Sequence, residues 1–163
     1  MHMKFLFFLL VILQSCAWGQ SPDYKEMLKE YYDGFPTISI ANARTKIHAK
    51  NVYFLDTREK VEYNVSHIEG AWLVGYENFS LGWLKKIPKD AEIIVYCSIG
   101  ARSQEIGHRL KDAGYSKVSN LYGGLFYWAN EHYPLVNSKG STNKIHGYSS
   151  GWGKWVKCGE VVY

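Results

Sequence analysis

The chain has 163 residues, a length typical of one domain that is large enough to bury its own hydrophobic core. Its composition is 47% hydrophobic and 21% charged, which excludes a disordered or fibrous protein. The net charge is only +4 and the basic residues are scattered, which argues against the clustered basic surface of nucleic-acid-binding proteins, so we expect no nucleic-acid partner.

The N-terminal residues have the pattern of an export signal. Lys4 supplies a positive charge, and the apolar run at 5–13 is too short to span a membrane. Residues 17–19 have the small-x-small form of a cleavage site, whereas the residues leading up to Cys16 resemble a bacterial lipobox. We predict a signal peptide at 1–19, or a lipoprotein signal that ends before Cys16. Either signal predicts export to the periplasm or the bacterial envelope, with membrane attachment only through a lipid on Cys16.

From residue 22 onward, helical and β-prone segments alternate along the chain. Pro22 opens a helix that Gly34 and Pro36 end, so residues 20–36 form an N-terminal helix and lead-in. The later elements are expected as strands at 37–40, 52–55, 71–74, 93–96 and 118–121, and as helices at 41–50, at 59–64, around Trp83, from 103 to 113 and from 124 to 131. The run at 93–96 is continuously apolar, as in a strand that is covered on both faces of a parallel sheet. We therefore predict an α/β fold.

Residues 137–163 differ in composition from the domain expected at 37–136. Gly, Ser and Lys are interleaved there with aromatic residues that include Tyr148, Trp152 and Trp155. We expect a C-terminal tail whose tryptophans pack on the sheet domain, in preference to an aromatic platform that binds a sugar or another ligand.

Cys97 is the strongest candidate for a catalytic residue. It follows the strand at 93–96, and the ligand site of an open parallel sheet lies beyond the carboxyl ends of its strands. Gly100 allows the chain to curl tightly before Arg102 opens the next helix, so backbone N–H groups can point inward, bind an anion and stabilise a thiolate. We expect Cys97 to be the nucleophile and Arg102 its electrostatic partner. The anion-binding loop is expected to consist of Ser98, Ile99, Gly100, Ala101 and Ser103.

A thiolate at residue 97 could attack the outer sulfur of a donor such as thiosulfate and hold it as a persulfide until an acceptor nucleophile removes it. The alternative is a buried structural cysteine, which is the commoner state of a lone cysteine. The succession of a strand, a Cys-x-x-Gly-x-Arg-Ser run and a helix favours the catalytic interpretation.

Four separate segments resemble motifs of the rhodanese-like family. Residues 55–59 resemble its D-x-R-E segment, 67–71 its H-I-x-G-A segment, 97–103 its active-site loop, and Gly123, Gly124 and Trp128 its G-G-x-x-x-W pattern. The chain thus resembles a single rhodanese-like domain over about 37–136. The resemblance implies an open five-stranded parallel sheet with helices on both faces, and a six-residue catalytic loop in which Cys97 carries the persulfide and Arg102 closes the ring. The related phosphatases and arsenate reductases have one more residue between Cys and Arg, which disfavours their chemistry here.

Two departures from the family pattern leave the natural sulfur donor open. Ser66 stands where family members usually have Gly, and Ser98, Ile99 and Ala101 bring no additional charge to the loop. Thiosulfate, a larger thiol persulfide and a protein donor all stay candidates.

The remaining chemistry-bearing residues are assigned structural roles. Asp56 could accept hydrogen bonds from the loop or orient Arg58, and we favour a structural pairing of these two supporting residues. His67 and His108 show no metal-ligand spacing, so no metal and no cofactor are expected. Cys158 could resolve a persulfide on Cys97, but a bystander role is preferred.

Together these observations predict a sulfurtransferase that moves a sulfane sulfur from a donor such as thiosulfate to a thiophilic acceptor. The expected partners are a small anionic sulfur donor, a thiol acceptor and, because the compartment is oxidising, a reductant protein. The protein is expected to be a monomer. The alternative function is a non-catalytic redox-sensing or sulfur-binding module that uses the same loop.

Overall fold

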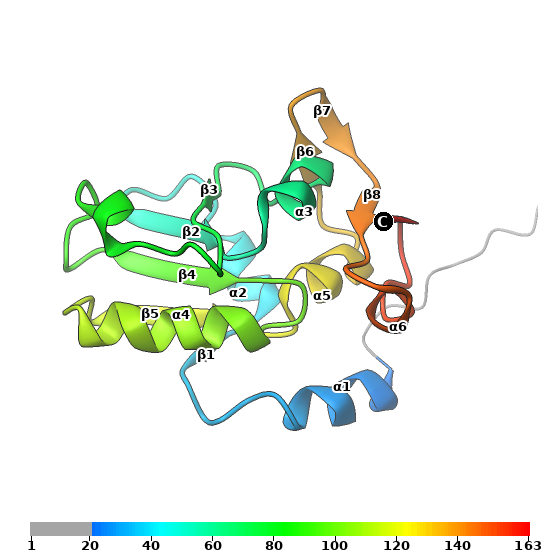
Figure 1. The fold of residues 1–163 in the computed structure, drawn as a ribbon, viewed down its shortest axis with the longest axis horizontal. Helices are drawn as coiled ribbons and strands as arrows, with labels where there is room; N and C mark the ends of the chain where they lie inside the picture. The colour runs from blue at the N-terminus through cyan, green and yellow to red at the C-terminus, as the bar shows by residue number, and fades with distance from the viewer. Residues whose placement is uncertain (1–20) are drawn as a thin grey trace, which may run out of the picture.

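The computed structural model describes residues 21–163, so the predicted signal and Cys16 lie outside the described residues. At its centre is a five-stranded sheet whose strands are all parallel and lie in the order β1-β5-β4-β2-β3 (Figure 1). The strands are β1 (Thr37–Ile38), β2 (Val52–Asp56), β3 (Trp72–Leu73), β4 (Glu92–Tyr96) and β5 (Lys117–Leu121). The predicted α/β fold with a five-stranded parallel sheet is confirmed.

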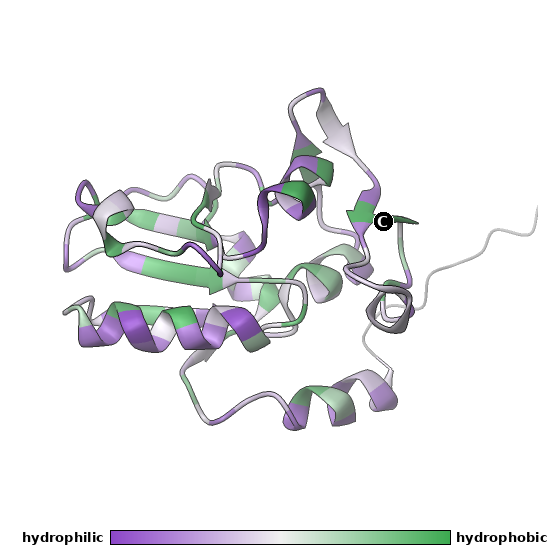
Figure 2. Ribbon diagram, viewed as in Figure 1, coloured by the Kyte–Doolittle hydropathy of each residue, from purple (hydrophilic) through white to green (hydrophobic). Residues whose placement is uncertain are grey.

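Helical elements cover both faces of this sheet, as predicted. They are α1 (Pro22–Lys29), α2 (Ile40–Arg44), α3 (Lys60–Val65), the 3-10 helix η1 (Leu81–Leu84), α4 (Ala101–Asp112) and α5 (Gly124–Asn130). Successive side chains of a strand point to opposite faces of its sheet. Ile93 and Val95 of β4 accordingly pack with Leu110 of α4, whereas Ile94 and Tyr96 pack with residues of α2 and α5. Figure 2 shows hydrophobic residues along the central strands and polar residues over much of α4.

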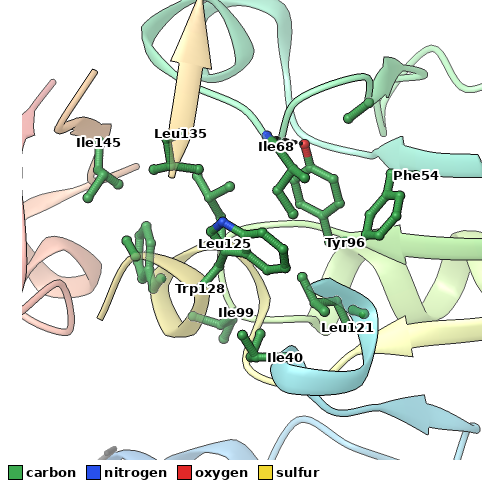
Figure 3. Close-up of a cluster of buried hydrophobic side chains, with 14 of the residues drawn as sticks. Ile40, Phe54, Ile68, Tyr96, Ile99, Leu121, Leu125, Trp128, Leu135 and Ile145 are labelled. Atoms are coloured by element: carbon green, nitrogen blue, oxygen red, sulfur yellow. Dashed lines mark hydrogen bonds between the residues drawn. The ribbon is translucent and has the colours of Figure 1, made fainter. Parts of the chain in front are cut away.

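The core on the α5 side fixes the end of β4. Trp128 of α5 is fully buried, and its Nε1 donates a hydrogen bond to Pro134 O at 3.0 Å. Figure 3 shows Tyr96 and Phe54 from the sheet close to Ile68, whose backbone N–H donates to the Tyr96 hydroxyl at 3.2 Å. Tyr96 is therefore held at both its backbone and its side chain, directly before Cys97.

Several predicted elements differ from those in the structure, and the helix predicted at 41–50 ends already at Arg44. Ile40 belongs to α2 rather than to the first strand, because Ser39 Oγ caps the helix by accepting from Asn42 N at 3.2 Å. The segment around Trp83 forms a single 3-10 turn rather than an α-helix. The helix after the cysteine loop begins at Ala101, before the start predicted at 102–103.

Residues 135–163, which include the predicted tail, form small ordered elements. They are β6 (Leu135–Asn137), β7 (Gly140–Thr142), β8 (Lys144–His146), α6 (Ser150–Gly153) and β9 (Glu160–Val162). Figure 1 shows them gathered at one end of the sheet, next to α3 and α5. The Trp155 ring packs edge-on against Tyr24 at 5.4 Å between centroids, and Trp152 packs against Tyr31 at 5.5 Å. These C-terminal tryptophans therefore contact α1 and the residues just after it.

The longest helix described in residues 21–163 is α4, at Ala101–Asp112. None of the described helices is long and apolar enough to cross a membrane.

Candidate functional site

Cys97 lies at the carboxyl end of β4, in the turn that leads into α4. Its Sγ accepts a hydrogen bond from Gly100 N at 3.1 Å. Gly100 has a φ of +109°, a backbone conformation that residues with a side chain rarely adopt. The first hydrogen bond of α4 runs from Gln104 N to Gly100 O, so the N–H groups of 101–103 are not used by the helix. The helix start therefore places N–H donors and the positive end of its dipole next to the sulfur.

The Gly-Gly turn before α5 packs directly against the backbone of the cysteine loop. Leu125 N donates to Cys97 O at 2.8 Å, and Phe126 N donates to Ser98 O at 3.0 Å. This close approach requires a residue without a side chain at Gly124, because an added Cβ would lie 2.5 Å from Cys97 O. The carbonyl groups of the loop are thus fixed by the first turn of α5.

Replacing Gly124 with alanine is expected to displace the cysteine loop and to slow sulfur transfer. The collision with backbone atoms should lower the free energy of unfolding by about 1–3 kcal/mol, as overpacking does elsewhere. Gly75 is a matched control, because its φ of +68° is close to the +60° of Gly124 and a Cβ there meets nothing within 4 Å. Urea unfolding of Gly124→Ala and Gly75→Ala separates the collision from backbone strain, and equal losses in the two variants would contradict the role of Gly124.

Polar side chains fix the remaining loop carbonyls. Asn120 Nδ2 donates to Gly100 O at 2.8 Å, and Ser103 Oγ donates to Asn120 Oδ1 at 2.7 Å. The Tyr32 hydroxyl donates to Ile99 O at 2.9 Å and accepts from the N–H of residue 123 at 2.7 Å. Burial raises the pKa of Tyr32, so its hydroxyl keeps the proton that it donates.

Arg102 is directed toward Glu62 of α3. Its Nη1 and Nη2 donate to the two carboxylate oxygens at 2.9 and 2.8 Å, and Ser98 Oγ donates to Glu62 Oε1 at 3.2 Å. Burial tends to raise the pKa of Glu62, but the hydrogen bonds from Arg102 outweigh it and hold that pKa below its ordinary value. Burial tends to lower the pKa of Arg102, but Glu62 and Cys97 hold it above its ordinary value. Both side chains are therefore charged, and Glu62 balances the positive charge beside Cys97.

Replacing Glu62 with glutamine is expected to remove a pH-dependent contribution to stability. In the wild type this contribution is fully present above the unfolded-state pKa of Glu62, near 4.5, and is lost as the pH falls through the lower folded-state value. The difference in the free energy of unfolding between wild type and Glu62→Gln should therefore shrink below about pH 4.

Urea unfolding across a pH series measures the effect of Glu62→Gln. Glu26→Gln is the control, because the Glu26 side chain is 73% exposed and its pair with Lys29 contributes little. A difference between wild type and Glu62→Gln that stays constant with pH would contradict the ionised pair with Arg102.

A pocket of about 190 Å³ opens over the cysteine loop. It reaches Cys97, which is otherwise buried with 1% exposure. Its walls are Tyr31, Cys97, Ser98, Ile99, Ala101, Arg102, Tyr148 and Trp152. The Tyr148 ring lies against the Arg102 guanidinium, with 5.0 Å between Cζ and the ring centroid. Aromatic side chains from outside the sheet domain thus share a pocket with the sulfur atom.

Asp56 and Arg58 form a buried ion pair behind the loop. Arg58 Nε and Nη2 donate to Asp56 oxygens at 2.9 and 2.6 Å, and Nη2 also donates to Ser66 O at 2.6 Å. Burial tends to lower the pKa of Arg58, but Asp56 outweighs it and raises that pKa. Thr57 N donates to Tyr96 O at 2.9 Å. The ion pair therefore joins the end of β2 to the segment that contains Ser66, and the bond from Thr57 N joins the end of β2 to β4.

The loop contains none of the other candidates, which are His67, His108 and Cys158. His67 stacks on the Tyr63 ring, with centroids 3.7 Å apart, and His108 pairs with Asp33 at the surface. Cys158 is disulfide-bonded, whereas Cys97 is a free thiol. Cys158 in this state is not a thiol that could attack a persulfide. Within residues 21–163, no three His, Cys, Asp or Glu side chains are grouped as a metal site would need.

Several site residues were missed by the sequence analysis. Glu62 could have been noticed as the third residue after Glu59, where the two form a capping box at the start of α3, but its pairing with Arg102 spans 40 residues. Tyr31, Tyr148 and Trp152 carry no local signal for this pocket, because only the tertiary fold brings the segment after α1 and the C-terminal tail to the loop.

The described geometry suits nucleophilic sulfur chemistry. A free sulfur atom lies at the base of an accessible pocket, and the Gly100 N–H donates directly to it. The same donors can stabilise a negative charge on a second sulfur bound to the first.

Comparisons with known proteins identify the family of the sheet domain. Residues 39–131 match the family model described as "Rhodanese-like domain". A probable adenylyltransferase/sulfurtransferase MoeZ from Mycobacterium tuberculosis is 35% identical over 86 residues, covering 52% of this chain and 22% of the relative. A sulfurtransferase from Allochromatium vinosum is 40% identical over 57 residues, covering 35% of this chain and 53% of the relative. The chain thus spans about a fifth and about half of the lengths of these two relatives.

A solved structure also shares the fold. The rhodanese-related protein from Thermoplasma volcanium superposes with a TM-score of 0.56 and 26% sequence identity. The match covers 63% of this chain and 98% of that one. The five-stranded parallel sheet and its helices therefore have the same fold as this rhodanese-related protein.

Proposed function

The chain belongs to the rhodanese-like domain family, and on this basis we propose that it is a sulfurtransferase that passes a sulfane sulfur through a persulfide on Cys97. The observation that carries the proposal is the placement of the Cys97 sulfur between the Gly100 N–H and an accessible pocket. Relatives that share the domain are named sulfurtransferases.

In the proposed first step, the Cys97 thiolate attacks the outer sulfur of the donor. A new S–S bond forms to Sγ, the S–S bond of the donor breaks, and the leaving group departs with the electron pair, as sulfite does when thiosulfate is the donor. The Gly100 N–H and the start of α4 stabilise the negative charge on the transferred sulfur.

In the second step, an acceptor nucleophile such as a thiolate or cyanide attacks the terminal sulfur. The persulfide S–S bond breaks, and Cys97 leaves as a thiolate, ready for the next donor. Arg102, fixed by Glu62, keeps a positive charge near the sulfur throughout both steps. We also propose that the protein is exported and works with a reductant protein, because a thiolate in an oxidising compartment needs a reductant to stay reactive.

Intact-mass measurement of the protein after incubation with thiosulfate or an organic sulfur donor tests this function. The expected result is the gain of one sulfur atom, which cyanide then removes as thiocyanate. A wild-type protein that gains no sulfur from any donor would overturn the proposal.

A further inference from the structure

The pocket over Cys97 is completed by residues from outside the matched family region. The family match covers 39–131, whereas Tyr31 precedes it and Tyr148 and Trp152 follow it. Trp152 and Tyr31 pack edge-on at 5.5 Å between ring centroids. Three aromatic side chains from the two flanks of the domain thus border the space through which the sulfur is reached.

Tyr148 is held in place by an unusual backbone conformation. Its φ is +64°, which is rare for a bulky residue and indicates that the surrounding structure fixes it. Its N–H donates to His146 Nδ1 at 3.0 Å, while its ring lies against Arg102. The tail therefore places the ring at the edge of the pocket at the expense of backbone strain.

The pocket offers little positive charge that could stabilise the second negative charge of a dianionic donor. Arg102 is the one cationic side chain that lines it within residues 21–163, and the Glu62 carboxylate that accepts from both Nη atoms balances its charge. A dianion such as thiosulfate would place its second negative charge beside aromatic and aliphatic side chains, among them Ile99 and Trp152. A monoanion needs only the donors around the Cys97 sulfur.

The size of the pocket also fits an organic group. An apolar protein cavity of about 150 Å³ binds benzene. The pocket over Cys97 has a volume of about 190 Å³ and is open at one side. It can therefore hold a ring-sized apolar group while the sulfur end of the same molecule reaches Cys97.

We propose that Tyr31, Tyr148 and Trp152 make this pocket selective for a monoanionic organic sulfur donor that carries a ring-sized apolar group. This inference rests on the proposed function. With an organic thiosulfonate, Cys97 bonds to the outer sulfur, the S–S bond of the donor breaks, and a sulfinate leaves with the electron pair. With an organic persulfide, the same attack releases a thiolate.

Benzenethiosulfonate and methanethiosulfonate form a matched pair of probes, because they share the reacting S–S bond and the single negative charge. With cyanide as acceptor, thiocyanate formation gives kcat/KM for each donor. We expect the wild type to prefer the phenyl donor by roughly tenfold or more, since a hydrophobic pocket gains this much from a few added carbon atoms. In Trp152→Ala and Tyr148→Ala, that preference should fall to within about threefold.

Control variants separate pocket contacts from general damage to the fold. Trp83→Ala removes a tryptophan that is 53% exposed on η1 and outside the pocket, so it should keep the wild-type preference. Trp152→Phe should restore most of the preference. Tyr148 is 55% exposed, which makes Tyr148→Ala the safer variant if Trp152→Ala does not fold.

Each outcome of this experiment distinguishes the two proposals. If the wild type forms a persulfide with both donors but shows equal kcat/KM values, or if the preference survives both alanine variants, the pocket assignment is overturned while the sulfurtransferase proposal stands. If no donor places sulfur on Cys97, the proposed function itself fails.

Discussion

Replacing Cys97 with alanine is expected to abolish sulfur transfer and to lower thiocyanate formation at least about a thousandfold, as removal of a catalytic nucleophile does in other enzymes. The Sγ atom is the one that forms and breaks bonds in both proposed steps. The Gly100 N–H and the helix start can still bind an anion in the variant, but no atom remains to carry the sulfur. Thiocyanate formation from an organic thiosulfonate and cyanide measures the loss.

Cys97→Ser is the closest control for this result. A serine keeps the size and the position of the side chain, so the loop should be undisturbed, yet a hydroxyl does not form a stable persulfide analogue. Both variants should gain no sulfur by intact mass and should unfold near the wild-type temperature. Turnover that persists in Cys97→Ala would contradict the mechanism. A wild type whose Cys97 reacts without any thiocyanate formation would instead support the non-catalytic module.

The parts of this fold that are predictable from the sequence are those fixed by local patterns. The apolar run at 93–96 indicates a strand that is buried on both faces, and β4 is such a strand. Gly100 and the helix after it indicate a turn with free N–H groups, which is what surrounds Cys97. The strand prediction is wrong at Ile40. An apolar β-branched residue favours a strand locally, but the Ser39 cap stabilises a helix that begins at Ile40.

The parts of the site that are not predictable depend on contacts between distant residues. Glu62 and Arg102 are 40 positions apart, and neither residue type at its own position indicates the other. Trp152 was expected to pack on the sheet domain at 37–136. Its ring contacts Tyr31 of the lead-in, and its place in the pocket wall depends on the path of the whole tail. Periodicity describes one element at a time, so it cannot show which surfaces a tail will cover.

Replacing Asp56 with asparagine is expected to lower the free energy of unfolding by about 3–5 kcal/mol, because it leaves the Arg58 charge buried without its partner. Both side chains are 0% exposed, so water cannot solvate the guanidinium in place of the carboxylate. Asparagine keeps an oxygen that can accept from Arg58 N, so the variant tests the charge rather than the local turn. Urea unfolding at neutral pH measures the loss, and Glu160→Gln, at a side chain that is 55% exposed, is the control.

A double variant separates the ion pair from the packing around it. Asp56→Leu alone should be strongly destabilising, whereas Asp56→Leu combined with Arg58→Met removes both charges and should recover much of the loss. Additive losses in the double variant would contradict a coupled pair. Because Thr57 N and Ile68 N both bond to Tyr96, weakening this region should also loosen the residue directly before Cys97. We therefore expect the double variant to recover a larger share of its stability than of its sulfur transfer. It lacks the Arg58 Nη2 group that fixes the carbonyl of Ser66 in the wild type.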